Sequence, residues 1–167
     1  MKDYEKSIKF LAANSEDFEF TNKGAEHASI VLVNMLNQTE DEFLMFSGTF
    51  NSDVADQDAF LFALERYLES GKKFKLLLEE EIKKESKAFK LFKKYAKKDG
   101  IVEFKQASQD FINEVKDIFE GNILHFAVSD SKRYRLETDK ENFKAIGNFN
   151  DPQLAQSFKD LFEDNYR

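Results

Sequence analysis

Short apolar segments and longer amphipathic segments alternate along most of the chain. Three apolar runs predict buried strands, at residues 42–50, 74–78 and 101–106. Four segments that repeat apolar side chains at helical spacing predict helices, at residues 22–37, 56–70, 79–98 and 109–120. Strands that alternate with helices in this way are typical of a sheet whose faces are covered by helices.

The pattern changes after residue 120. Three further strands are expected at residues 123–129, 133–138 and 143–148, with turns at 130–132 and 139–142. The pair Asp151-Pro152 then predicts a final helix, because proline is favoured in the first helical turn. We therefore expect an α/β fold: a mixed sheet flanked by helices on both faces, ending in a β-meander and a C-terminal helix.

The composition indicates one domain over residues 1–167. The chain is 41% hydrophobic and has 19 phenylalanines, which is enough to build a substantial core. Residues 1–21 form an N-terminal extension in which only two short strand-like pieces stand out, at 7–11 and 18–20. No apolar run approaches the ~20 residues that span a bilayer, so we expect no membrane insertion and a cytoplasmic location.

The same composition bears on several kinds of site. There is no cysteine, and the two histidines, His27 and His125, argue against a histidine metal cluster, so no metal or cofactor is expected. A net charge of −7 disfavours general affinity for nucleic acid. The charge is uneven, since residues 72–98 contain eleven lysines and four glutamates. We interpret this basic stretch as the solvated face of a helix.

Two segments of the final meander carry a recognisable spacing. The first is Ile123-Leu124-His125-Phe126-Ala127-Val128-Ser129-Asp130, and the second is Gly147-Asn148-Phe149-Asn150. Their spacing resembles the H-x-K-x4-D and G-S-x-N motifs of the phospholipase D superfamily. The order of predicted elements also resembles one half of a phospholipase D-like domain. In that superfamily the histidine is a nucleophile, the lysine and asparagine bind phosphate, and a second half or subunit completes the site. The resemblance therefore implies a homodimer.

The chain departs from these motifs at the positions that matter for chemistry. Asp130, Gly147 and Asn150 match, but Ile123 stands at the position of the nucleophile and His125 at that of the lysine. A second register would make His125 the nucleophile, but it loses the aspartate. Isoleucine cannot attack phosphorus, so the resemblance implies a phosphate-type cleft without the usual reaction.

Other polar residues are candidates for the same cleft. Gly48-Thr49-Phe50-Asn51 has the same form as the segment at 147–150, so Ser47, Asn51, Asn150 and His125 are expected to flank a common cleft if both tips lie at one end of the sheet. The alternative is two ordinary glycine–asparagine turns. His27, at the opening of the first predicted helix, is either an anion ligand or a surface or capping residue.

One predicted strand alternates charged and apolar side chains. Arg133, Arg135 and Glu137 share one face of the strand, because successive side chains point to opposite faces. Arg135 is the best candidate for recognising a phosphate or carboxylate with its forked guanidinium group. Alternatively, Arg135 and Glu137 form a solvated or structural pair.

These observations lead to three functional hypotheses. The first is a non-catalytic phospholipase D-like binding or regulatory module that retains an anion cleft and binds a phosphate-containing ligand, a nucleic-acid end or a protein partner. The second is an active phosphodiesterase or nuclease that uses His125 in a non-standard way. The third is a structural accessory subunit with no ligand site.

Overall fold

The fold was determined from a computed structural model that describes residues 1–50, 52–97 and 99–166. One mixed sheet of seven strands runs through the molecule in the order β1-β7-β6-β5-β2-β3-β4. The strands are β1 (Phe20–Asn22), β2 (Glu42–Ser47), β3 (Lys73–Leu78), β4 (Val102–Gln106), β5 (Phe126–Ser129), β6 (Arg133–Asp139) and β7 (Lys144–Asn148). The helices are α1 (Lys2–Ala13), α2 (Ala25–Gln38), α3 (Ser52–Ala55), α4 (Asp58–Glu69), α5 (Lys87–Tyr95), α6 (Gln109–Ile118) and α7 (Pro152–Tyr166).

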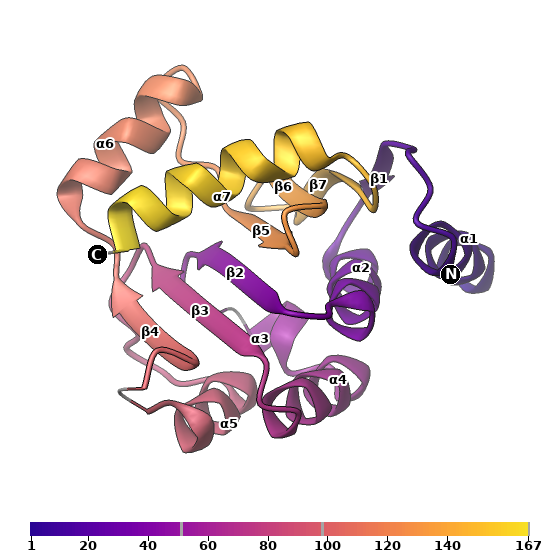
Figure 1. Ribbon diagram of the computed structural model, residues 1–167, viewed down its shortest axis with the longest axis horizontal. Helices are drawn as coiled ribbons and strands as arrows, with labels where there is room; N and C mark the ends of the chain where they lie inside the picture. The colour runs from indigo at the N-terminus through magenta and orange to yellow at the C-terminus, as the bar shows by residue number, and fades with distance from the viewer. Residues whose placement is uncertain (51, 98, 167) are drawn as a thin grey trace.

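Helices cover both faces of the sheet, as the sequence predicts (Figure 1). α2, α3, α4 and α5 lie on one face, and α6 and α7 lie on the other. Each face has its own hydrophobic core: Phe43, Phe74 and Phe92 belong to the first, and Phe46, Phe126 and Phe162 to the second. Phe43 and Phe46 come from the same strand and point to opposite faces, so β2 contributes to both cores.

The strand directions decide which loops meet. β2, β3 and β4 are parallel, whereas β5, β6, β7 and β1 are joined by antiparallel pairing. The end at which β2 and β3 finish is therefore also the end at which β5 begins, since Phe46 pairs with Phe126. We call this the carboxyl end of the sheet, and the opposite one the amino end. In open α/β sheets, ligands tend to bind at the carboxyl end.

The strand-like piece predicted at residues 7–11 is wrong, and the one predicted at 18–20 lies two residues before the strand that forms. Residues 2–13 form helix α1, and β1 begins only at Phe20. Ile8 and Ala12 are buried one helical turn apart, and α1 packs on α2. The helical repeat of these apolar residues therefore prevails over the alternation of a short strand.

The helix predicted at 79–98 is much shorter than expected. Glu79 and Glu80 donate backbone hydrogen bonds to the carbonyl groups of Ser47 and Gly48, at 2.8 and 3.1 Å, which keeps the chain extended beyond β3. The helix begins after Ser86, whose side-chain oxygen accepts a hydrogen bond from the backbone N–H of Phe89 at 3.0 Å. Residues 79–86 are therefore a loop at the carboxyl end of the sheet.

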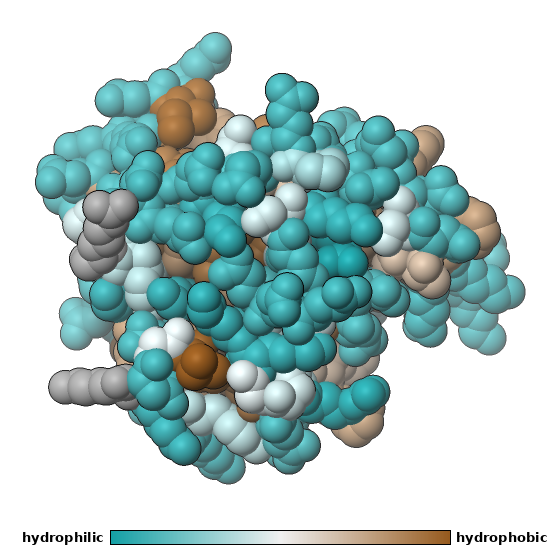
Figure 2. Space-filling model, viewed as in Figure 1, coloured by the Kyte–Doolittle hydropathy of each residue, from teal (hydrophilic) through white to brown (hydrophobic). Residues whose placement is uncertain are grey.

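The surface is mostly polar. On the face shown in Figure 2, hydrophobic residues form small, separated patches among hydrophilic ones. Large exposed apolar side chains are scattered over several elements: Phe10, Phe18, Phe62, Ile101, Phe104 and Ile118. In the described part of the chain, no helix has both the length and the apolar character needed to cross a bilayer.

Candidate functional site

A pocket of about 300 Å³ opens at the carboxyl end of the sheet. It lies between strands β2, β5 and β6 on one side and helices α2, α3 and α4 on the other, and the β6–β7 hairpin and the loop after β2 complete its wall. The space exists because small residues stand where larger ones would fill it: Ala28, Gly48, Ala55 and Ala127.

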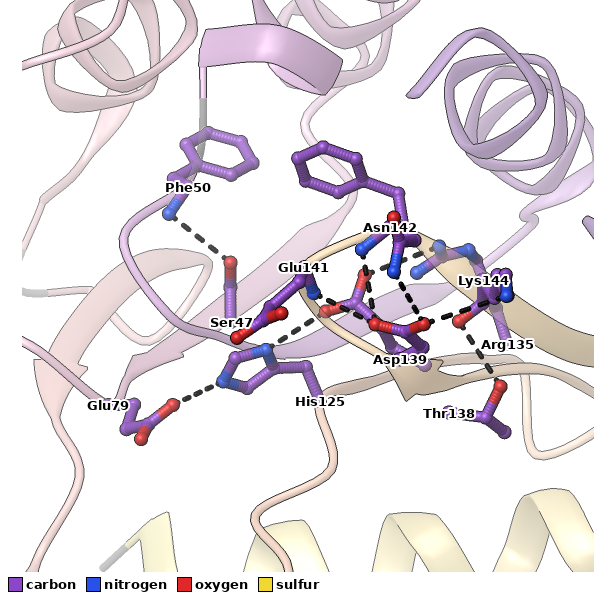
Figure 3. Close-up of polar contacts among 12 residues, drawn as sticks. Ser47, Phe50, Glu79, His125, Arg135, Thr138, Asp139, Glu141, Asn142 and Lys144 are labelled. Atoms are coloured by element: carbon purple, nitrogen blue, oxygen red, sulfur yellow. Dashed lines mark hydrogen bonds and ion pairs between the residues drawn. The ribbon is translucent and has the colours of Figure 1, made fainter. Parts of the chain in front are cut away.

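His125 lies in this pocket between two carboxylates (Figure 3). Its Nε2 is 2.5 Å from Oε2 of Glu79, and its Nδ1 is 3.2 Å from Oε1 of Glu137. All three side chains are nearly buried, at 12% exposure each. The ring packs edge-on against Phe46 and over Gly48, where an added Cβ would lie only 3.2 Å from Cε1. The imidazole is thus held by a carboxylate at each ring nitrogen and by packing against Phe46 and Gly48.

This arrangement favours the protonated ring. An ionised carboxylate only accepts hydrogen bonds, so two carboxylate partners favour the imidazolium form of His125, in which both ring nitrogens donate. Burial alone would lower the pKa of His125, but the hydrogen bonds and charges of Glu137 and Glu79 outweigh it and raise that pKa above 6.5. The hydrogen bond from His125 likewise lowers the pKa of Glu79. Neither ring nitrogen has a free lone pair.

Arg135 supplies a second buried cation. Its side chain is 6% exposed; Nε donates to Oδ1 of Asn22 at 3.0 Å, and Nη2 lies 3.4 Å from Oε2 of Glu137. Within residues 1–50, 52–97 and 99–166, Nη1 has no hydrogen-bond partner, and the residue lines the pocket. Burial lowers the pKa of Arg135, and the charge of Glu137 opposes that effect. The pair of Arg135 and Glu137 is nearly buried, so it is not a solvated ladder, whereas the structural form of that alternative agrees with their ion pair.

The rim of the pocket carries charges of both signs. Glu80 and Lys140 are exposed and line the opening. Lys140 lies in the β6–β7 turn, which Asp139 closes by accepting hydrogen bonds from the backbone N–H groups of Glu141 and Asn142 (Figure 3). The turn predicted at 139–142 is therefore confirmed, and it brings a lysine to the pocket.

The structure brings four of the candidate residues together at this pocket: Ser47, His125, Arg135 and Glu137. The side-chain oxygen of Ser47 accepts a hydrogen bond from the backbone N–H of Phe50 at 3.2 Å, which shapes the loop after β2. Asn51 lies outside the described residues. The pairing of β5 with β6 places Arg135 beside Ala127, which is why its long side chain reaches the cavity.

Asp130 lies at the amino end of the sheet. Its carboxylate accepts hydrogen bonds from the backbone N–H groups of Glu40, Asp41 and Glu42 at 2.8 to 3.1 Å, and from Nη1 of Arg133 at 2.8 Å. Burial would raise the pKa of Asp130, but these hydrogen bonds dominate and lower it. Asp130 therefore ties the β5–β6 turn to the start of β2.

Three further positions also lie away from the pocket. The backbone N–H of Asn150, beyond β7 at the amino end of the sheet, donates to the side chain of Asn148, so residues 48–50 and 147–150 do not share one end of the sheet. His27 stacks on Tyr4 with ring centres 3.6 Å apart and accepts a backbone hydrogen bond from Lys23. Ile123 packs against the second core.

Sequence reasoning missed Asn22, Glu79, Glu80 and Lys140. The signal for Glu79 and Glu80 is their position immediately after an apolar strand, where the carboxyl end of a parallel sheet places polar residues next to one another. In the described residues, no group of three or more histidine and acidic side chains is arranged so that it could hold a metal ion.

Among the comparisons with known proteins, the solved structures identify the fold. No family model matches the chain, and no curated protein matches its sequence. Among solved structures, Nuc from Salmonella typhimurium, a phospholipase D family member, is similar with a TM-score of 0.62 and 15% identity, over 90% of this chain and 95% of that one. NucT from Helicobacter pylori gives a TM-score of 0.58 and 13% identity, over 90% and 96%. TrmBL2, an archaeal chromatin protein that binds DNA, gives 0.59 and 17% identity; the match covers 99% of this chain but only 59% of TrmBL2.

Proposed function

Because the chain has a phospholipase D-like fold, we propose that it is a non-catalytic module that binds a small anionic ligand in the pocket beside Arg135. The observation that carries this proposal is the contact of both His125 ring nitrogens with the carboxylates of Glu79 and Glu137, an arrangement that we call the clamp. A histidine nucleophile needs a lone pair on one ring nitrogen, and both nitrogens of His125 face carboxylates. Catalysis by that residue would require one of its two partners to leave.

Arg135 supports a binding role. Arg135 is paired with Glu137 and Asn22, and within the described residues its Nη1 remains available at the pocket to donate hydrogen bonds to an anion. The pocket is small for a polymer, at about 300 Å³, the lower end of the range of about 300–1,000 Å³ found for small-molecule sites. A phosphate-containing molecule or the terminal phosphate of a nucleic acid is an anion of suitable size.

Thermal unfolding tests this function. A ligand that binds only the folded chain raises its melting temperature, so an anion that occupies the pocket should stabilise the protein in a concentration-dependent way. The panel should include inorganic phosphate, nucleoside monophosphates, a 5′-phosphorylated oligonucleotide and simple carboxylates. Arg135→Lys should remove the stabilisation, and Arg66→Lys, on the exposed surface of α4, should not. A panel without any effect would favour the structural accessory subunit.

A chromogenic phosphodiester, bis(p-nitrophenyl) phosphate, tests the catalytic alternative. We expect no turnover above that of the heat-unfolded protein. Turnover that is lost in His125→Ala would contradict the proposal and support a phosphodiesterase.

We also propose a homodimer, because the order of strands and helices resembles one half of a phospholipase D-like domain, which a second half or subunit completes. Sedimentation equilibrium should give twice the monomer mass of 19.5 kDa. A monomer at every concentration would remove this part of the proposal and leave the pocket unaffected.

A further inference from the structure

The pocket has a polar side and an apolar side. Arg135, Glu137 and His125 form the polar side, at strands β5 and β6. Toward α3 and α4 the lining becomes apolar, with five large side chains: Leu32, Met45, Phe50, Val54 and Phe60. Phe50 and Phe60 pack edge to face, with ring centres 6.0 Å apart. A ligand that fills the cavity must therefore combine a polar group with an apolar body.

The charges around Arg135 favour a ligand group with one negative charge over a group with two. Arg135 and the His125 imidazolium both contact Glu137, and Glu79 holds the other side of the histidine. Arg135, the His125 imidazolium, Glu79 and Glu137 together carry no net charge, so a bound monoanion leaves this cluster at −1. A phosphate monoester carries about −1.5 to −2 near neutral pH and would leave it more negative, while the rim charges of Glu80 and Lys140 offset each other.

The shape of the guanidinium favours a planar group. Nε is engaged by Asn22, so the edge that remains open is formed by Nη1 and the second hydrogen of Nη2. Two parallel hydrogen bonds from such an edge match the two oxygens of a carboxylate. A phosphate has more oxygens than this edge can pair, and those that turn toward the apolar side of the pocket lose hydration.

On these grounds we propose that the ligand is a small monocarboxylic acid with an apolar body, bound by Arg135 at one end and by the aromatic wall at the other. This inference rests on the proposed function, because it specifies the ligand of the same pocket. It goes further in excluding phosphate as the preferred group.

Calorimetric titration with matched ligands tests the inference. The probes are 3-phenylpropionate and hexanoate, the amide of the first as an uncharged analogue, and 2-phenylethyl phosphate with inorganic phosphate as the phosphate series. We expect the two acids to bind, and the amide and the phosphate ester to bind at least about tenfold more weakly, as expected for losing hydrogen bonds to a charged group. Acetate, which lacks the apolar body, should also bind weakly.

Two variants connect binding to the pocket. Arg135→Lys keeps the charge but loses the fork, and should weaken binding of 3-phenylpropionate at least about tenfold. Ala127→Leu fills the cavity beside Arg135 and should weaken it similarly, without changing any charge. The matched controls are Arg66→Lys and Ala13→Leu, at exposed positions outside the pocket. Circular dichroism establishes that each variant is folded before it is titrated.

The outcomes separate the inference from the proposed function. If the phosphates bind more tightly than the acids in an Arg135-dependent way, the carboxylate inference is overturned and the binding module stands. If the amide binds as tightly as the acid, the ligand is neutral and the inference again fails. If no probe binds the wild-type chain, both fail. Binding that survives both pocket variants would place the acid elsewhere and overturn the inference.

Discussion

At the scale of single residues, His125 joins three parts of the molecule. It links the loop after β3, through Glu79, to strand β6, through Glu137, and it packs over Gly48 in the loop after β2. The same contacts that remove its nucleophilic lone pair therefore also build the wall of the pocket.

The two histidines should titrate on opposite sides of pH 6.5. The hydrogen bonds of Glu137 and Glu79 outweigh burial and raise the pKa of His125, whereas burial and the positive N-terminus lower the pKa of His27. Nuclear magnetic resonance of the ring Cε1–H protons should resolve both titrations, because the chain has only two histidines. His27→Gln should remove the lower one. Coincident titrations near pH 6.5 would contradict the clamp.

The clamp should also give stability a defined dependence on pH. The raised pKa of His125 provides stability that is complete below its unfolded value of 6.5 and is lost as the pH rises through the folded value. The lowered pKa of Glu79 provides stability that is present above 4.5 and is lost as the pH falls through the folded value. Urea unfolding should therefore show the largest contribution between pH 4.5 and 6.5.

His125→Gln is the variant that isolates this contribution. The difference in unfolding free energy between wild type and variant should shrink as the pH rises above 6.5. His27→Gln, in which Glu79 and Glu137 keep their partner, serves as the control. A difference that is constant from pH 5 to pH 9 would mean that the ring is neutral in the folded chain.

Asp130 is the second residue with an unusual role, and its importance should appear in stability. Asp130→Ala removes the acceptor of three backbone N–H groups and leaves the buried Arg133 without its carboxylate. We expect a loss of about 3–5 kcal/mol in unfolding free energy, as when a buried ion pair loses one partner. Asp117→Ala, on the exposed face of α6, should change it by less than about 0.5 kcal/mol. Similar losses for both would refute this assignment.

At the scale of the elements, local pattern determined what could be predicted. The strands from β2 to β7 follow apolar runs, and their order fixed the mixed sheet and its helical layers in advance. α1 was missed because its buried face consists of few residues, chiefly Ile8 and Ala12. The predicted helix at 79–98 begins too early because the acidic residues at 79–81 are compatible with a first helical turn. Only the backbone hydrogen bonds from Glu79 and Glu80 to Ser47 and Gly48 show that this segment is a loop.

The same limits apply to the candidate site. Arg135 and Glu137 were predictable as neighbours because they alternate along one strand. The partnership of His125 with Glu79 joins residues 46 positions apart, and it depends on the register of β3 and β5 with β2. No local pattern carries that information, which is why the clamp was not foreseen.

The start of α5 leads to a prediction about capping. Ser86 is buried and its oxygen accepts the N–H of Phe89, so Ser86→Ala should lower the unfolding free energy by about 1 kcal/mol. Ser7→Ala, at an exposed position within α1, is the matched control and should have little effect or be slightly stabilising. Chemical unfolding followed by circular dichroism measures both. An unchanged Ser86→Ala variant would mean that the cap contributes nothing to the helix.

At the scale of the whole molecule, the strands of the sheet differ in how many neighbours hold them. β2 lies between β3 and β5 with a helix layer on each face, whereas β1 is a three-residue edge strand that pairs only with β7. Asn22 ends β1 and connects it to the pocket, because its side chain accepts a hydrogen bond from Arg135 and donates one to the carbonyl of Phe143. A short edge strand therefore holds the residue that orients the guanidinium group of Arg135.

Hydrogen exchange followed by mass spectrometry should reveal this gradient. Amides of β1 and of the adjoining β7 should exchange faster than those of β2 and β3, since local opening requires fewer contacts to break at the edge of the sheet. Asn22→Ala should accelerate exchange in β1 and β7 while leaving β3 unchanged, and Asn14→Ala, at an exposed helix end, should do neither. Two results would contradict this expectation: equal protection of the β1 and β2 amides, or an equal acceleration of exchange in all strands of Asn22→Ala. Either result would mean that the whole sheet opens as one cooperative unit. Otherwise the edge strand opens independently, and the orientation of Arg135 depends on whether β1 is paired.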